Sequence, residues 1–93
     1  MTALSPNRIV AYNLARARAL RGWTQAEAAE WLKPYLGVRW SVASFSAAER
    51  SYDGKKLREF TADEIVAFAQ AFEQPILFFF TAPPPSHVSW RAP

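Results

Sequence analysis

The chain contains no cysteine and a single histidine, His87. Without cysteine it forms no disulfide and offers no thiolate to a metal ion, a composition typical of the reducing cytoplasm. His87 stands in a proline-rich segment with no carboxylate beside it, so it lacks the partners of a catalytic base or a metal ligand. We therefore expect no enzyme activity, no metal site and no cofactor.

Glycine and long apolar runs are also scarce. Only Gly22, Gly37 and Gly54 occur, far apart, so no glycine-rich loop is available to hold phosphates. The longest apolar run, residues 76–80, is too short to cross a bilayer, and residues 1–6 lack the charged and apolar parts of a signal peptide. These absences predict a cytoplasmic protein that uses no membrane and has no evident small-molecule substrate.

The charged residues are distributed unevenly along a chain of net charge +3. Residues 1–21 carry four arginines and no acid, residues 50–58 carry four cations against Asp53, and residues 61–80 carry acids only. Basic segments that fold onto one face make a phosphate-binding surface. On separate faces, the same charges are ordinary solvated helix surface.

The spacing of apolar residues predicts helices and no strands. Hydrophobic residues make up 51% of 93 residues, enough for the core of one domain. No segment alternates apolar and polar residues for long enough to be a strand. We predict an all-α fold, a compact bundle of four to five short helices over residues 1–80, followed by a proline-rich tail over residues 81–93.

Capping signals locate the first two helices. The pair Ser5-Pro6 predicts the start of the first, and Gly22 predicts its end. Thr24-Gln25-Ala26-Glu27 is a capping box that opens the second. Pro34 predicts either that this helix ends at or before Lys33 or that it continues past the proline with a kink. The side chains expected to face the core are Val10, Leu14, Ala17, Ala28, Trp31 and Leu32.

The later helices follow from the same signals. Ser41 predicts the N-cap of a third helix over residues 42–49. A second capping box at residues 61–64 opens a fourth helix that runs to about Glu73, and Pro75 permits a short fifth turn. The side chains expected to face inward are Phe45, Ala48, Ile65, Phe68, Ala69 and Phe72.

Three stretches in this order resemble the phage-repressor/Cro (XRE-type) helix-turn-helix family. The first half of the family's motif is similar to a set of residues in this chain: Leu14, Arg18, residues 22–25, Ala28-Ala29 and Leu32. Residues 37–51, with Gly37, Ser41 and Phe45, resemble the second half, and residues 68–80 the closing helices. The resemblance covers about residues 8–80. It implies a lambda-repressor-like bundle and a transcriptional regulator, of the repressor kind, that binds double-stranded DNA as a homodimer.

The resemblance also assigns roles to residues. A major groove admits one α-helix while a second helix braces it across the backbone, which implies that residues 42–49 enter the groove. The base-facing candidates are Arg39, Val42, Ala43, Ser44 and Ala47. The phosphate-binding candidates are Thr24, Gln25, Arg50, Lys55, Lys56 and Arg58. Bidentate hydrogen bonds to a base are not available to Val42, Ala43 and Ala47. Direct recognition of the base sequence therefore rests on contacts with thymine methyl groups and on the side chains of Ser44, Arg39 and Arg50. The shape and deformability of the DNA supply the remaining specificity.

Two charged features have alternative interpretations. The family's counterparts of Arg18 and Glu49 form a partly buried ion pair, whereas two separate surface charges would contribute under about 1 kcal/mol. The basic loop over residues 54–58 is either a phosphate clamp after the recognition helix or an ordinary solvated loop.

A protein-interaction or antitoxin-type module is the alternative function. Residues 76–80 are more apolar than a small monomer needs, so part of this segment is expected to form a homodimer or partner surface. The residues assigned to that surface are Ile76, Phe78, Phe79, Phe80 and Trp90.

Overall fold

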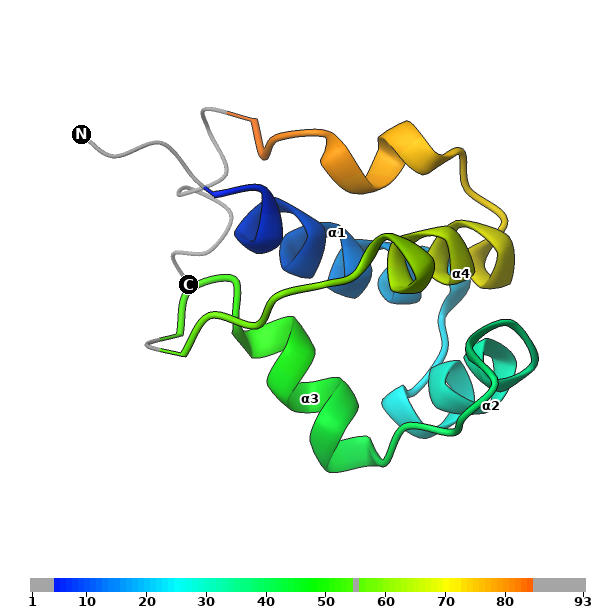
Figure 1. The fold of residues 1–93 in the computed structure, drawn as a ribbon. Coiled ribbons are helices and arrows are strands. Elements are labelled where there is room, and N and C mark those ends of the chain that lie inside the picture. Colours follow the sequence, from blue (N-terminus) through cyan, green and yellow to red (C-terminus); the bar gives the residue numbers. More distant parts are fainter. Residues whose placement is uncertain (1–4, 55, 85–93) are drawn as a thin grey trace.

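The computed structural model describes residues 5–54 and 56–84, which form helices and no strand (Figure 1). The all-α bundle of four to five short helices is therefore confirmed. In the described ranges, no helix combines the length and the apolar character needed to cross a membrane. The elements are α1 (Pro6–Arg21), α2 (Gln25–Leu36), α3 (Val42–Arg50), α4 (Ala62–Phe72) and the 3₁₀ helix η1 (Ile76–Phe80).

Each α-helix begins at a predicted cap. The side-chain oxygens of Ser5, Thr24, Ser41 and Thr61 each accept a hydrogen bond from the backbone N–H three residues later. In both predicted capping boxes the glutamate side chain also accepts from the N–H of the cap residue. Because these bonds satisfy N–H groups that have no partner within the helix, they fix where each helix starts.

The end of α2 differs from the first of the two predicted alternatives. The helix does not stop at Lys33 but passes through Pro34 and ends at Leu36. Pro34 removes the N–H that would bond the carbonyl of Glu30, yet it lies in the last turn and is exposed, so solvent can reach that carbonyl. Gly37 then takes a left-handed conformation, with φ of 83°, and donates its N–H to the Lys33 carbonyl at 2.8 Å. The connection to α3 is consequently only residues 37–41.

The core is rich in phenylalanine and lies where the four α-helices and η1 meet. Figure 1 shows η1 on one side of α1 and α3 on the other. Trp40, just before α3, packs edge-on against Phe45 and Phe68, with ring centroids 5.7 Å away in both cases. The fully buried large side chains are Phe45, Phe68, Phe72, Phe79, Leu14, Leu32, Val10 and Asn13.

Two aromatic side chains lie where the sequence did not place them. Trp31, expected in the core, is 57% exposed and stacks on Trp23 with ring centroids 5.4 Å apart. Ala28 faces inward as expected, and the neighbouring Ala29 does so in place of Trp31; both side chains are small and let α2 approach the bundle closely. Phe79, assigned to a partner surface, is fully buried, because η1 packs against both α1 and α4.

Candidate nucleic-acid interface

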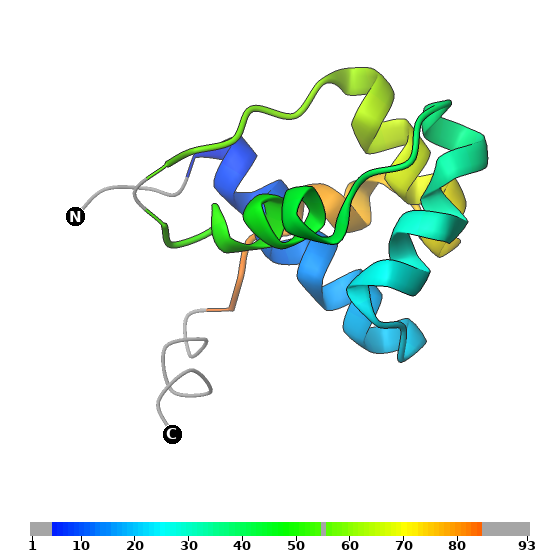
Figure 2. The same ribbon diagram turned by 90° about the horizontal axis from the view of Figure 1, so that it is seen from below.

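Helix α3 has one buried face and one exposed face. Phe45 and Ala48 are fully buried, whereas Val42, Ala43 and Ala47 are exposed on the other side. Ser44 is also exposed, and its hydroxyl accepts a hydrogen bond from that of Ser41 at 3.0 Å. Figure 2 shows α3 on the near side of α1 with no other described helix in front of it. Of the base-facing candidates, those on α3 therefore share one accessible surface.

The C-terminal end of α3 is tied to α1 by Arg8. Its Nη1 donates to the carbonyl oxygens of Ser51, Tyr52 and Gly54, at 3.1, 2.9 and 3.3 Å. At Gly54 the chain passes so close to α3 that an added Cβ would lie 2.8 Å from the Arg50 carbonyl oxygen. No sequence motif distinguishes Arg8 from the other arginines, because its acceptors are backbone carbonyl groups, which every residue carries.

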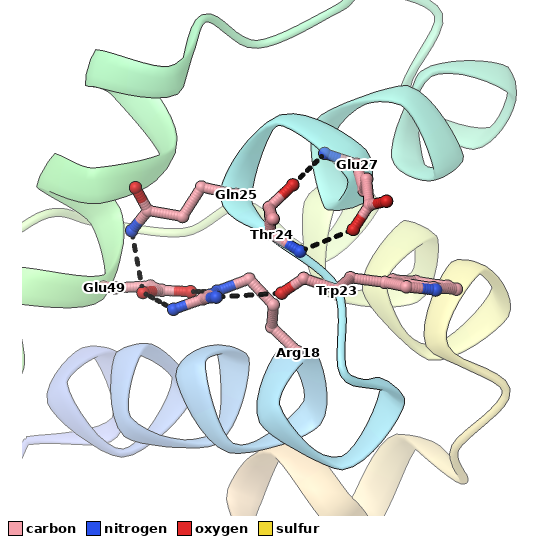
Figure 3. A network of polar contacts seen from close by, with 6 residues as sticks. All are labelled: Arg18, Trp23, Thr24, Gln25, Glu27 and Glu49. Atoms are coloured by element: carbon pink, nitrogen blue, oxygen red, sulfur yellow. Dashed lines mark hydrogen bonds and ion pairs between the residues drawn. The ribbon is translucent and has the colours of Figure 1, made fainter.

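A polar network joins α1, α2 and α3 (Figure 3). Arg18 donates from Nε to Glu49 Oε2 at 2.6 Å and from Nη2 to Oε1 at 3.0 Å, and its Nη1 donates to the Trp23 carbonyl at 2.9 Å. Gln25 Nε2 donates to Glu49 Oε1 at 3.0 Å. The Arg18 and Glu49 side chains are 25% and 9% exposed, so this is the partly buried pair that the resemblance implies.

This network keeps Arg18 charged. Its hydrogen bonds to Glu49 raise the pKa of Arg18, burial opposes that rise, and the coulombic attraction of Glu49 adds to it. A base whose pKa is raised on folding stabilises the fold at every pH below its unfolded-state value, and loses that contribution only as pH rises through the folded value. For an arginine, that loss falls in strong alkali, so the contribution of Arg18 protonation is constant around neutral pH.

The phosphate-binding candidates are not equally available. The Thr24 hydroxyl accepts from the Glu27 N–H as the cap of α2, and the amide of Gln25 donates to Glu49. Arg50 is exposed at the end of α3 and donates to Ser46 Oγ at 3.0 Å. Lys56 is exposed and lines a groove of about 390 Å³ together with Ala47 of α3. Lys55 lies outside the described residues.

Arg39 precedes α3 and pairs with Glu30 of α2. Both side chains are about half exposed, at 49% and 58%, so solvent screens this pair strongly. A phosphate can therefore replace Glu30 as the partner of Arg39 at little cost. Among the described residues, three exposed cations thus lie at or near the ends of α3 along the chain: Arg39 before it, Arg50 at its C-terminal end and Lys56 after it.

The side chain of Arg58 does not point outward as expected for a member of a phosphate clamp in the loop after α3. It turns toward the protein, where Nη2 contacts Glu64 Oε2 at 2.9 Å. Its guanidinium lies over the rings of Trp40, at 4.7 Å, and Phe60, at 5.3 Å. Because the aromatic rings and a carboxylate attract the cation together, Arg58 attaches the loop to α4 and to Trp40, which precedes the N-cap of α3.

The proposed partner surface on η1 is smaller than the sequence indicated. Ile76 and Phe80 are 43% and 45% exposed, whereas Phe79 belongs to the core. Phe78 is half-buried beneath the Arg16 guanidinium, whose carbon lies 4.3 Å from the ring centroid. Leu77, which is not among the residues predicted to form this surface, is 73% exposed. Trp90 lies outside the described residues.

The chain was compared with known proteins at three levels. A scan of family models, a search of curated proteins and a search of solved structures each gave no match. The assignment of function therefore rests on the residues and geometry described above.

Proposed function

We propose that this protein binds double-stranded DNA as a transcriptional regulator, a repressor in the simplest case, and inserts α3 into the major groove. The observation that carries the proposal is the outer face of α3, which is exposed, bears no acidic side chain and belongs to a helix held by α1 and α2. Its one acid, Glu49, is neutralised by Arg18 on the inner side. The resemblance to phage-repressor helix-turn-helix domains agrees with this use of α2 and α3.

The cations flanking α3 supply the affinity. Arg39 precedes the helix, Arg50 ends it and Lys56 lies beside Ala47. Each lysine or arginine that neutralises a phosphate releases condensed counterions, so binding weakens steeply as salt rises. The N-terminus of α2, opened by Thr24 and Gln25, adds backbone N–H groups that favour a phosphate.

The first test is a salt series with duplex DNA. We expect the logarithm of the binding constant to fall linearly with the logarithm of salt concentration, and Arg39→Gln, Arg50→Gln and Lys56→Gln each to reduce that slope by about one unit. Gln70→Glu on α4 lowers the net charge equally and is the control, with an unchanged slope expected. No binding at low salt, or an equal effect of all four variants, contradicts the proposal.

The second test concerns sequence reading. Val42, Ala43 and Ala47 offer only methyl groups on the outer face of α3, and the thymine methyl is the major-groove feature that suits them. In the best duplex selected from a random library, we expect replacement of thymine by deoxyuridine under α3 to weaken binding by roughly tenfold, equivalent to about 1.4 kcal/mol. Deoxyuridine outside the footprint is the control. Unchanged affinity at every thymine would show that methyl groups are not read.

A homodimer or partner surface on η1 is the second candidate, and the exposure of Leu77, Ile76 and Phe80 favours it. We expect light scattering to show a mass that rises from monomer toward dimer with concentration, and Leu77→Asp to shift this transition to at least tenfold higher concentration. Val66→Asp, at an exposed valine of α4, is the control. A monomer at every concentration would contradict the homodimer, and the exposed surface of η1 would then be assigned to a different protein, as in an antitoxin-type module.

A further inference from the structure

Helix α3 ends differently from the other α-helices. After α1, α2 and α4 the chain turns at a residue with left-handed backbone conformation, which is Gly22, Gly37 or Glu73. After α3 the next residue, Ser51, keeps a right-handed conformation, with φ of −66° and ψ of −11°. A left-handed residue turns the chain sharply and closes a helix with backbone hydrogen bonds. The path of the chain after α3 lacks this device and depends on other contacts.

Arg8 of α1 supplies such contacts to the turn. Its Nη1 donates to the carbonyl oxygens of Ser51, Tyr52 and Gly54. Hydrogen bonds from a charged donor are stronger than those between neutral groups, and the carbonyl end of a helix attracts a cation. Gly54 also lies against α3, because its N–H donates to the Arg50 carbonyl at 2.9 Å. The turn is thus held both by Arg8 and by the end of α3.

Lys56 lies between two fixed points of the loop that follows. At Gly54 the chain is held by Arg8, and at Arg58 it is attached to α4. Lys56 is exposed between them and shares a groove of about 390 Å³ with Ala47 of α3. Because a lysine side chain is a flexible four-carbon stem, the position of the backbone largely decides which phosphate its ammonium reaches. The contact between Arg8 and the turn therefore determines where Lys56 lies relative to α3.

We propose that Arg8 is a positioning residue for DNA binding, which places Lys56 beside a phosphate at the edge of the groove that α3 enters. The inference rests on the proposed DNA binding of α3 and adds a role for the first turn of α1. Arg8 acts through Lys56, because its Nη1 is taken up by three carbonyl oxygens. Loss of the Arg8 side chain thus releases the turn and moves the lysine away from its phosphate.

A double-mutant cycle in the salt series with duplex DNA tests the proposal. Arg8→Met removes the bonds to the turn, and we expect it to reduce the slope by about one unit because Lys56 no longer meets its phosphate. In the Arg8→Met background, Lys56→Gln is then expected to leave the slope unchanged and to alter affinity less than about twofold. Arg16→Met is the control, at an exposed arginine of α1 that covers Phe78, and Lys56→Gln is expected to keep its full effect beside it.

Gly54→Ala disturbs the same turn without changing the charge. The added Cβ would lie 2.8 Å from the Arg50 carbonyl oxygen, so the chain must shift, and we expect the same loss of the Lys56→Gln effect. This variant decides the test if Arg8→Met does not fold. Hydrogen exchange gives a readout without DNA: in Arg8→Met we expect the Gly54 amide to exchange at least about tenfold faster, while the amides of α4 change less.

Two results would overturn the proposal. If the effects of Arg8→Met and Lys56→Gln on the slope add, Arg8 binds a phosphate itself and does not position Lys56. If Arg8→Met leaves the slope unchanged, its bonds to the turn have no part in DNA binding. Absence of DNA binding by the unaltered protein is a different result: it contradicts the proposed function, while hydrogen exchange still reports whether Arg8 holds the turn.

Discussion

Replacing Ala43 by glutamate is expected to weaken binding to the selected duplex by at least 100-fold, about 3 kcal/mol. Ala43 is exposed on the outer face of α3, so the new carboxylate would meet the acceptors and phosphates of the major groove without a partner. Like charges placed across an interface cost several kcal/mol. The measurement is fluorescence anisotropy with labelled duplex at fixed salt.

The same substitution is mild for folding, which makes the result specific. Position 43 is in the first turn of α3, where a carboxylate favours the helix dipole by a few tenths of a kcal/mol. Gln70→Glu carries the same change in net charge on α4, and we expect it to alter affinity less than twofold. Equal losses for both variants would indicate a general charge effect, and unchanged affinity for Ala43→Glu would remove α3 from the interface.

The helices were predictable because their signals are local. A serine or threonine cap, a glutamate three residues later and an apolar stripe lie within one or two turns of each other, and the caps at Thr24 and Thr61 formed as expected. Pro34 shows the limit of this reasoning. The proline signal is also local, but the cap at Gly37 and the contact of Leu36 with the core are formed only in the fold, and α2 continues to Leu36.

The roles of single charged side chains were less predictable. In the sequence Lys56 and Arg58 are equivalent members of one basic loop, but Arg58 turns inward to Glu64 and Trp40 while Lys56 stays exposed. That choice depends on partners that are distant in the sequence or in another helix. The role of Arg8 could not be predicted for the same reason, because its acceptors are carbonyl groups more than 40 residues away. The Arg18–Glu49 pair was foreseen only through the family resemblance.

Of the substitutions proposed for this protein, removal of the Arg18 side chain is expected to lower the free energy of unfolding the most. Arg18→Met retains an unbranched side chain of similar length but leaves the Glu49 carboxylate, 9% exposed, with Gln25 as its remaining side-chain partner among those described. Stranding one member of a buried pair costs about 3–5 kcal/mol, a large share of the stability of a small domain. We expect urea denaturation at neutral pH to report a loss in this range.

The matched control is Arg39→Met, which removes the exposed pair with Glu30 and is expected to cost under about 1 kcal/mol. The double variant Arg18→Met/Glu49→Met separates two causes of the larger loss. If the loss comes from the stranded carboxylate, removing that carboxylate as well restores much of the stability, because an apolar pair carries no desolvation cost. If instead the single variant loses no more than the control, the pair behaves as two surface charges and does not hold α3 on α1.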